Sequence, residues 1–530
     1  PADAAARMRA IRGLIDPERP PLDQAVAVAT GEELRLLMDA HLPQLHVVTL
    51  DPPLQIWADR EKAGFSAWYE MFPRSASPDP NRHGTLGDLT KRLPYVASMG
   101  FDVLYLPPIH PIGRTKRKGR NNAITCDPGD VGSPWAIGAA EGGHKSIHPD
   151  LGDERDFAAL IKEAERLDIE IALDVALQCS PDHPYVREHP EWFRHRPDGS
   201  IQYAENPPKK YEDIYPIDFE CQQWEALWAE LRSIFDHWIE RGVRIFRVDN
   251  PHTKSFTFWE WLAAGLRRDH PDVLLLAEAF TRPKVMHRLA KIGFHQSYTY
   301  FTWRNDAWSL QQYMHELTQQ PPREFFRPNF WSNTPDILSE YVQHGGRSGS
   351  VIRLILAATL SANYGIYGPP FELVRTEPRP GKEEYIDNEK YEVHHWDLTE
   401  EHSLSDLIAL VNRIRRANPA LQQTNNITFH NCDNPAVLCF SKQSDDGVNT
   451  ILCAVNTDPH HTQWANLDLN MPALGLDWHD SFQAHDLLSG ARYAWQGQWN
   501  TVALHPHSSP AHILRVRRHG RTEHDFEYFV

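Results

Sequence analysis

The stretch GVRIFRVDNPHTK, Gly242 to Lys254, places an alternating apolar run directly before a cluster of charged and polar side chains. The run VRIFRV has the period of two that is typical of a β-strand, and Arg247 and Asp249 lie two residues apart near its end. Side chains two apart on a strand leave the same face of the sheet. The stretch therefore predicts a buried strand that ends with a carboxylate beside an arginine.

The surrounding sequence repeats this design. From about residue 65 to 415, short apolar or β-branched runs alternate with longer amphipathic stretches such as ERDFAALIKEAERL, which indicates βα units and a parallel sheet. The eight strand candidates are FSAWYEMFP, DVLYLPPIHP, IEIALDVAL, VRIFRVDN, VLLLAEAF, QSYTYFTW, NFWSNTPD and YGIYGPPFEL. They predict an α/β fold of the (β/α)8 TIM-barrel type, whose functional residues lie at the carboxyl ends of the strands. A doubly wound open sheet is the alternative, but polar residues cluster at strand ends all along the chain.

Three segments are predicted along the chain. Residues 1–64 are expected to form a helical appendage, with GEELRLLMDAHL as its clearest amphipathic piece. Residues 65–418 are expected to form the catalytic barrel, in which long loops rich in Pro, Gly and aromatic residues follow the second and third strands and wall the site. Short alternating segments such as AVLCFSK and HILRVRR predict a C-terminal antiparallel β-sandwich domain over 419–530.

Composition excludes several classes of function. A formal net charge of -17 argues against a nucleic-acid surface, which needs a basic face. No run of eighteen apolar residues occurs, so no membrane span is expected. The six cysteines are too sparse for a disulfide scaffold, and we expect free thiols in a reducing cytoplasm. No HExxH, CxxC, GxGxxG or GxxxxGK motif occurs, so neither a metal nor a nucleotide cofactor is expected.

Three carboxylates at predicted strand ends point to acid and base chemistry. Asp249 beside Arg247 is expected to stay ionised, because a nearby opposite charge favours the charged form. Glu278 stands alone after an apolar run, where burial raises a carboxyl pKa and keeps the group protonated. Asp249 and Glu278 stand on adjacent strand tips, where two carboxyls can lie about 5 Å apart, as retaining glycosidic chemistry requires. Asp336 ends a third strand, two strands later. The alternative is that each acid caps a helix or pairs with a loop arginine.

Two loops add basic groups to the same rim. They are KRKGRNN, Lys116 to Asn122, and NPPKKYEDIY, Asn206 to Tyr215. Such groups can hold an anionic part of a substrate through charge-assisted hydrogen bonds. The alternative is a solvated surface run with no ligand.

The segments GVRIFRVDN, LLLAEAF and SNTPD resemble, in chain order, the conserved regions of the α-amylase family of glycoside hydrolases and transferases. The resemblance implies that Asp249 is the nucleophile, Glu278 the general acid and base, and Asp336 the stabiliser of the transition state. Arg247 would orient the nucleophile. Ordinary α-amylases carry histidines where this sequence has Pro335 and Cys179-Ser180.

The segments WYEMFPRS, KGRNN, EGGHKSIHP, ENPPKKYEDIYPIDF and KEEYIDNEKYE narrow the resemblance to the maltosyltransferase group of that family. This implies a retaining enzyme of α-glucan synthesis that takes maltosyl from α-maltose 1-phosphate to an α-1,4-glucan acceptor and forms a homodimer. Implied donor contacts are Lys118, Gln178, Asp213, Asn250, Lys390 and Tyr391, and implied phosphate neighbours are Asn206, Lys209 and Tyr211.

Two alternatives remain at this point. An α-amylase-type hydrolase or a trehalose synthase would use the same three acids, and dependence on phosphate separates them from a maltosyltransferase. A carbohydrate-binding barrel without chemistry is disfavoured, because all three carboxylates and Arg247 are present.

Overall fold

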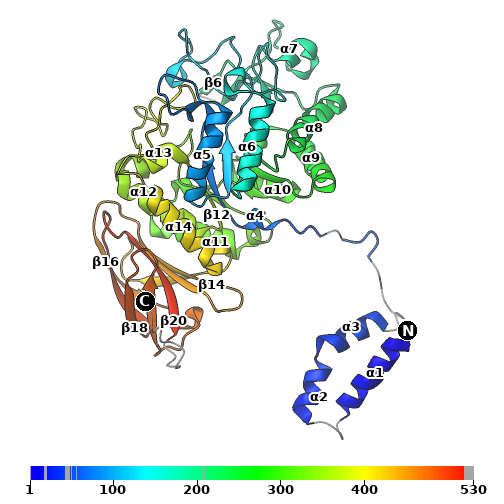
Figure 1. The fold of residues 1–530 in the computed structure, drawn as a ribbon, viewed down its shortest axis with the longest axis vertical. Helices are drawn as coiled ribbons and strands as arrows, with labels where there is room; N and C mark the ends of the chain where they lie inside the picture. Colours follow the sequence, from blue (N-terminus) through cyan, green and yellow to red (C-terminus); the bar gives the residue numbers. More distant parts are fainter. Residues whose placement is uncertain are drawn as a thin grey trace. The chain divides into compact units, whose positions relative to one another are not determined.

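The computed structural model describes residues 2–16, 21–41, 48, 50–54, 56–206 and 209–518. It forms two compact units, Pro1–Ala58 and Asp59–Val530 (Figure 1). The first unit contains helices α1 (Ala2–Ile15), α2 (Leu22–Ala29) and α3 (Glu32–His41), and α1 contacts both of the others. Its buried apolar side chains are Ile11 and Ala25 among the described residues, so this unit has a very small core.

The second unit is built on a parallel sheet with eight strands among the described residues, in the order β10-β9-β8-β3-β2-β1-β12-β11. The strands are β1 (Ser66–Glu70), β2 (Val103–Leu106), β3 (Glu170–Val175), β8 (Ile245–Val248), β9 (Leu274–Ala277), β10 (Gln296–Ser297), β11 (Asn329–Trp331) and β12 (Asn363–Tyr367). A parallel bridge between Ser297 and Pro328 joins the two ends of this order. The sheet is therefore a nearly closed (β/α)8 barrel, and the predicted fold is confirmed.

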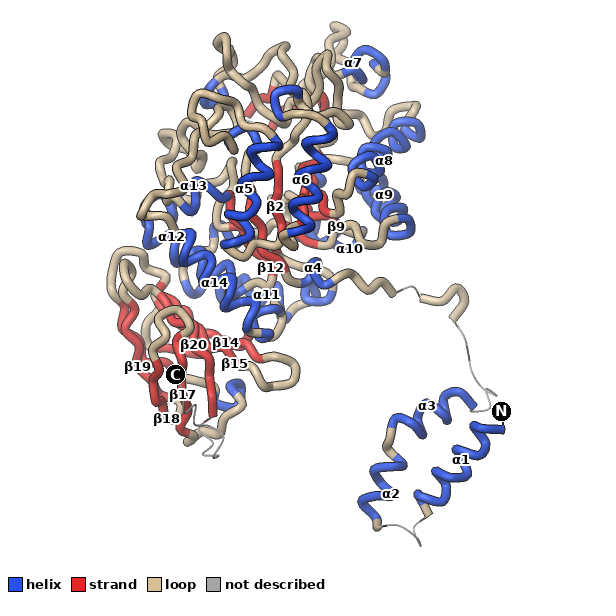
Figure 2. Tube along the Cα trace, viewed as in Figure 1, coloured by secondary structure: helices blue, strands red, loops and turns tan. Residues whose placement is uncertain are grey.

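Helices surround the barrel, as the blue and red tubes of Figure 2 show. They are α5 (Leu86–Ser98), α6 (Glu154–Arg166), α8 (Trp224–Glu240), α9 (Phe256–Asp269), α10 (Pro283–Ile292), α11 (Ala307–Gln319), α12 (Glu340–Leu360) and α14 (Ser405–Ala417), with the short α4 (Glu61–Gly64), α7 (Pro184–Glu188) and α13 (Gly368–Glu372). Capping boxes begin α5, at Thr85 with Asp88, and α6, at Asp153 with Asp156. None of the helices described is both long and apolar enough to cross a membrane.

Aromatic side chains fill the barrel interior. Trp331 stacks on Tyr298 with ring centroids 4.9 Å apart, and both belong to a buried cluster that includes Trp68 and Tyr105. A Cβ atom at Gly365, the register partner of Trp331, would lie 2.6 Å from the indole ring, so only glycine fits there. Polar side chains lie at both ends of this aromatic cluster: Ser66, Gln296, Asn329 and Asn363 are hydrogen-bonded at the amino ends of their strands, and the three predicted acids follow the carboxyl ends.

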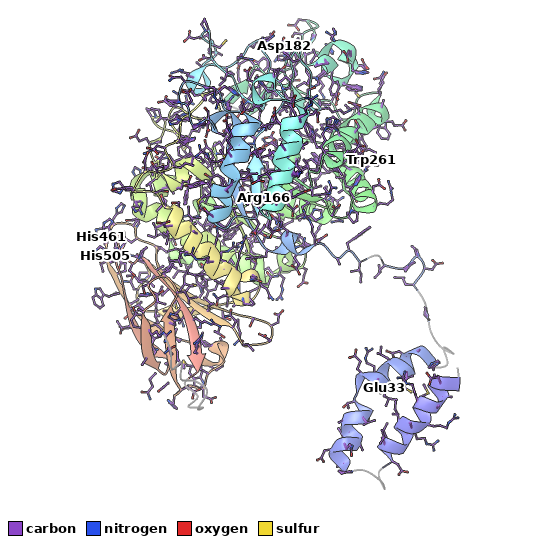
Figure 3. All side chains as sticks on the ribbon, in the orientation of Figure 1. Glu33, Arg166, Asp182, Trp261, His461 and His505 are labelled. Carbon is purple, nitrogen blue, oxygen red and sulfur yellow. The ribbon has the colours of Figure 1, made fainter. Side chains whose placement is uncertain are left out.

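Two long insertions lie over those carboxyl ends, as expected from the sequence. One runs from β2 to α6, and the other from β3 to α8. The second carries β4 (Gln178–Cys179), β5 (Ala204–Asn206), β6 (Lys209–Tyr211) and β7 (Tyr215–Pro216). Asp182, labelled in Figure 3, accepts hydrogen bonds from the backbone N–H groups of Arg114 and Thr115 at 2.6 and 2.7 Å, which ties the two insertions together.

The C-terminal part is an antiparallel sheet, as predicted, with the order β18-β17-β20-β15-β14-β13-β16-β19. Its strands are β13 (Ile427–Cys432), β14 (Val437–Gln443), β15 (Thr450–Asn456), β16 (Gln463–Asp468), β17 (Ser481–Asp486), β18 (Arg492–Gln496), β19 (Trp499–Leu504) and β20 (Ala511–Arg518). Apolar side chains of β14, β15 and β20 belong to two cores, one within this sheet and one shared with the barrel.

Candidate active site

The three predicted acids gather at the carboxyl ends of barrel strands. Asp249 directly follows β8, Glu278 directly follows β9, and Asp336 lies in the loop after β11. Because parallel strands of a barrel end on the same face, these carboxyls share one rim. Asp249 and Glu278 are buried, whereas the Asp336 side chain is 42% exposed.

Arg247 connects two of these acids with a third carboxylate. Its Nη1 lies 2.7 Å from Asp174 Oδ2 and 3.1 Å from Asp249 Oδ1, and its Nη2 lies 3.0 Å from Glu278 Oε1. The guanidinium also lies over the rings of Tyr105 and Tyr298. One planar cation thus holds the nucleophile and acid candidates on neighbouring nitrogens. Their predicted separation of about 5 Å stays a prediction.

Glu278 has the environment expected of a general acid. Burial raises its pKa to about 8, the Arg247 guanidinium opposes that rise, and the charge of Asp249 adds to it. The backbone N–H of Asn250 donates to Glu278 Oε2 at 3.2 Å. Asn250 adopts a left-handed conformation with φ 41°, which asparagine tolerates better than most residues. The raised pKa favours retention of a proton on this carboxyl, as a general acid requires.

Asp336 is paired with Lys390 from the loop after β12. Lys390 Nζ lies 2.9 and 3.1 Å from the two carboxylate oxygens and sits 4.8 Å from the centroid of the Trp135 ring. Burial acts to lower the pKa of Lys390, but the Asp336 carboxylate helps to hold it well above its ordinary value. Asn388 Nδ2 donates to the carbonyl of Pro335, which fixes the Lys390 segment against the loop of the third acid.

A cavity of about 380 Å³ lies in front of these acids. Its lining includes Asp249 and Asp336 together with seven predicted substrate-binding residues, Lys118, Gln178, Tyr211, Asp213, Asn250, Lys390 and Tyr391. Arg247 and Glu278 are not among the described lining residues. Asn206 and Lys209 are register partners on β5 and β6, but their side chains lie outside the described part of the chain.

The cavity lining also includes two charged residues of the insertions, Lys118 and Asp213. Lys118 is almost fully buried and forms an ion pair with Glu212. Asp213 is 2% exposed, burial raises its pKa to about 6, and its Oδ1 has no hydrogen-bond partner. A buried oxygen without a partner beside a cavity is well placed to bind a ligand hydroxyl.

Asp174 and Lys254 also belong to the site, although no role was predicted for either. Asp174 accepts hydrogen bonds at one oxygen from Tyr105, Trp135 and Arg247, and burial raises its pKa to about 7. Lys254 lines the cavity. It is the last residue of the GVRIFRVDNPHTK stretch from which the site was predicted. Asp174 was detectable as the acid of the run IEIALDVAL that shares the inward face with Ala172.

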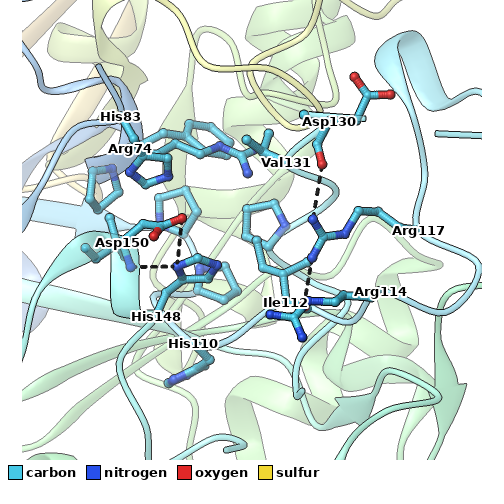
Figure 4. A pocket seen from close by; sticks show the side chains of 17 residues that line it. Arg74, His83, His110, Ile112, Arg114, Arg117, Asp130, Val131, His148 and Asp150 are labelled. Carbon is cyan, nitrogen blue, oxygen red and sulfur yellow. Dashed lines mark hydrogen bonds and ion pairs between the residues drawn. The ribbon is translucent and has the colours of Figure 1, made fainter. Parts of the chain in front are cut away.

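A second cavity, of about 260 Å³, is lined by other residues (Figure 4). Its polar lining includes Arg74, Arg117 and His148. Arg117 donates to the carbonyls of Ile112 and Asp130, and His148 Nδ1 accepts from the backbone N–H of Asp150. None of the three predicted acids lines it, so the 380 Å³ cavity is the candidate active site. Within the described residues, no group of three or more His, Cys, Asp or Glu side chains is placed to hold a metal ion.

Comparison with known proteins shows the family and agrees with the fold. The family "Alpha amylase, catalytic domain" matches residues 70–230, and "GLGE, C-terminal" matches residues 429–516. An α-1,4-glucan:maltose-1-phosphate maltosyltransferase from Chlorobaculum tepidum is 55% identical over 501 residues, which cover 93% of this chain and 75% of that protein. The chain belongs to the α-1,4-glucan:maltose-1-phosphate maltosyltransferase family.

This member of the maltosyltransferase family has a further relative of the same name, and its fold is similar to that of solved α-amylases. The enzyme of the same name from Methylacidiphilum infernorum is 52% identical and covers 98% of this chain and 78% of its own. An α-amylase from Lactobacillus plantarum has a TM-score of 0.64 at 19% identity, covering 86% of this chain and 100% of its own. A maltogenic α-amylase from Thermotoga neapolitana has a TM-score of 0.66 at 18% identity, covering 86% and 99%. The last two similarities concern the fold alone.

Proposed function

We propose that this chain is a retaining maltosyltransferase. It moves maltosyl from α-maltose 1-phosphate to the non-reducing 4-hydroxyl of an α-1,4-glucan and releases inorganic phosphate. The donor lies in the 380 Å³ cavity against Lys118, Gln178, Asp213, Asn250, Lys390 and Tyr391. Its phosphate lies near Asn206, Lys209 and Tyr211.

The first half of the reaction forms a covalent intermediate. An Asp249 carboxylate oxygen attacks the anomeric carbon as the bond from that carbon to the phosphate oxygen breaks. Glu278 gives its proton to the departing phosphate, which its raised pKa allows at neutral pH. Asp336 stabilises the transition state through the sugar hydroxyls, and Arg247 keeps the nucleophile charged and in place.

The second half reverses these roles. The acceptor 4-hydroxyl loses its proton to Glu278 and attacks the anomeric carbon, and the bond to Asp249 breaks. Two displacements give net retention of the α configuration. Transfer outcompetes hydrolysis when water is kept out, and the two long insertions over the site supply that cover.

The proposal rests on the position of Lys254 in the cavity wall. It lines the same cavity as the nucleophile candidate, its Nζ bonds to Thr253 Oγ1 at 3.0 Å, and it forms no ion pair with any carboxylate among the described residues. The charges of Asp249 and Glu278 act on Lys254, so this cation lies near the acids in the cavity wall, where it suits a phosphate donor. A hydrolase that acts on neutral glucan has no need of it.

The test is release of inorganic phosphate from α-maltose 1-phosphate with and without maltohexaose, followed by mass analysis of the glucan. We expect acceptor-dependent release and products longer by two glucose units. Shortening of maltohexaose with no phosphate release would instead identify an α-amylase-type hydrolase. Conversion of maltose to trehalose would identify a trehalose synthase.

We extend the proposal to glycogen or related α-glucan synthesis in the cytoplasm by a homodimer. The six cysteines are free thiols, which supports a reducing compartment. In this proposal residues 65–418 carry the catalysis, residues 1–64 are a helical appendage and residues 419–530 form the C-terminal β domain. Light scattering of the purified protein tests the dimer.

A further inference from the structure

The outer face of the C-terminal sheet carries two exposed tryptophans. Trp464 on β16 and Trp499 on β19 are 68% and 60% exposed. The alternate residues of the same strands, Ala465, Leu467 and Val502, are buried in the core of this sheet. The tryptophans therefore lie on the solvent side of the β16–β19 pair. The other side of this pair packs in the core of the sheet, so the two indoles are not needed for that core.

The register places both rings on one face. Trp464 is opposite Ala503, and Trp499 is opposite Asp468, four residues further along β16. Directly opposed residues of an antiparallel pair share a face, as do residues four apart on a strand. At about 3.3 Å per residue, the two ring positions are separated by about 13 Å along the sheet.

A hydrogen-bonded polar row lies between the rings. Thr501 Oγ1 donates to Asn466 Oδ1 at 2.6 Å, and Asn466 Nδ2 donates to Asp433 Oδ2 at 2.6 Å. Thr501 and Asn466 are register partners midway between the two tryptophan rows. Along β16 the face carries Trp464, Asn466 and Asp468, and along β19 it carries Ala503, Thr501 and Trp499, so polar groups lie between and beside the two rings.

The arrangement of rings and polar groups favours one class of ligand over others. A stable protein interface has a well-packed core depleted of charged residues, whereas here Asp433 and neutral polar groups separate the rings. A nucleic acid would be repelled by Asp433. A glucan chain presents flat apolar ring faces, which pack on indole, and hydroxyls, which donate to carboxylate and amide oxygens.

We propose that this face, the Trp464/Trp499 platform (Asp433, Trp464, Asn466, Trp499 and Thr501), binds a segment of the polymeric α-1,4-glucan acceptor. The choice of an α-glucan rests on the proposed function. A polymer held at the platform presents its chain ends to the active site at raised effective concentration, which a short oligosaccharide cannot exploit. The platform touches no reacting atom, so it affects the use of the polymer and leaves the chemical step unchanged.

The experiment compares the double variant Trp464→Ala/Trp499→Ala with the wild type and with Trp308→Ala. Trp308 lies on α11 and is 71% exposed, so it controls for loss of an exposed indole elsewhere. Native gels containing glycogen measure polymer binding, and phosphate release from α-maltose 1-phosphate gives KM for glycogen and for maltohexaose. We expect loss of retardation in the double variant and a rise of at least about tenfold in KM for glycogen, with KM for maltohexaose unchanged.

If glycogen in the gel retards the double variant as strongly as the wild type, the proposal that the Trp464/Trp499 platform binds glucan is wrong. If light scattering instead shows loss of a dimer while glycogen binding persists, the face is a contact between two copies and the proposal is wrong. A second pair of substitutions, Trp464→Thr/Trp499→Thr, keeps strand propensity should the alanine variant unfold. If no acceptor supports phosphate release in the wild type, the proposed function fails, while the gel still decides whether the platform binds glucan.

Discussion

Arg247 is the residue on which the charge balance of the site depends. Its two terminal nitrogens contact Asp174, Asp249 and Glu278 within 3.1 Å, and the whole group is buried. A lysine in its place is a point charge and cannot reach three carboxylates from two sides at once. The unpaired carboxyl would lose its orientation or take up a proton.

We therefore expect Arg247→Lys to reduce kcat by at least about 100-fold, within the range that positioning of catalytic groups can contribute. The measurement is acceptor-dependent phosphate release. Arg166→Lys is the matched control, because Arg166 forms an exposed ion pair with Glu163 on α6. Activity of Arg247→Lys within threefold of the wild type would contradict the assigned role.

We expect Glu278 to set the alkaline limit of activity. Its pKa is raised to about 8 by burial, so the proton needed for phosphate departure is lost as pH rises through that value. We expect kcat/KM to fall about tenfold per pH unit well above pH 8. Stopped assays between pH 6 and 10 measure this, with circular dichroism showing that the fold persists. A profile that stays flat to pH 10 would exclude Glu278 as the acid.

Replacement of Glu278 tests the expected role of this residue as general acid independently of the pH profile. Glu278→Gln keeps the size of the side chain but has no proton to give, so we expect kcat to fall by about 100- to 10,000-fold. Glu240→Gln, an exposed position at the end of α8, is the control and should retain full activity. Equal activity of the two variants would show that another group supplies the proton.

The sequence predicted these acids because each directly follows or ends an apolar run. Asp174 was missed for the opposite reason, since IEIALDVAL reads as one continuous buried strand. Its role emerges only when β3 pairs with β8 and brings Asp174 beside Arg247 as its register partner. Lys118 and Asp213 stand on separate insertions, and no local pattern indicates that the two share a cavity.

The pairing of strands β11 and β12 depends on a close approach of the Gly365 backbone to the Trp331 ring. Gly365→Ala would place a methyl group 2.6 Å from the Trp331 ring, which is itself fixed against Tyr298. We expect a loss of about 1–3 kcal/mol in the free energy of unfolding, measured by urea titration. Gly64→Ala, where nothing lies within 4 Å of the new atom, is the control. Equal stability of the two variants would mean that the barrel interior is loosely packed.

The eight barrel strands were all predicted, but the C-terminal sheet was predicted only in part. QWANLD and SFQAHD, which form β16 and β17, contain too few apolar residues to register as strands, because one face of each is largely exposed. RYAWQGQWNTVALHP reads as one alternating segment, yet Gly497, with φ 63°, separates β18 from β19. These two strands pair with β17 and β16, which no local pattern specifies.

At the scale of the whole second unit, the barrel and the C-terminal sheet share a hydrophobic core. Phe440, Cys453 and Ile513 pack in the same cluster as the barrel helices. Lys442 lies within this joint at 1% exposure, and its Nζ donates to the carbonyls of Leu360 and Gln423 at 3.0 and 2.6 Å. Leu360 ends α12, so the lysine satisfies a helix C-terminus from the neighbouring domain.

Burial lowers the pKa of Lys442 from 10.5 to about 7. Between these values the unfolded chain binds a proton that the folded chain does not, so raising the pH stabilises the folded state over that window. We expect the stability of the wild type relative to Lys442→Met to rise from pH 7 to 10 by up to about 1.4 kcal/mol per pH unit. Thermal unfolding of both proteins across that range measures the difference, with Lys91→Met as an exposed control. Parallel curves for wild type and Lys442→Met would show that the joint holds this lysine charged, because the carbonyl at the end of α12 then offsets the cost of burying it.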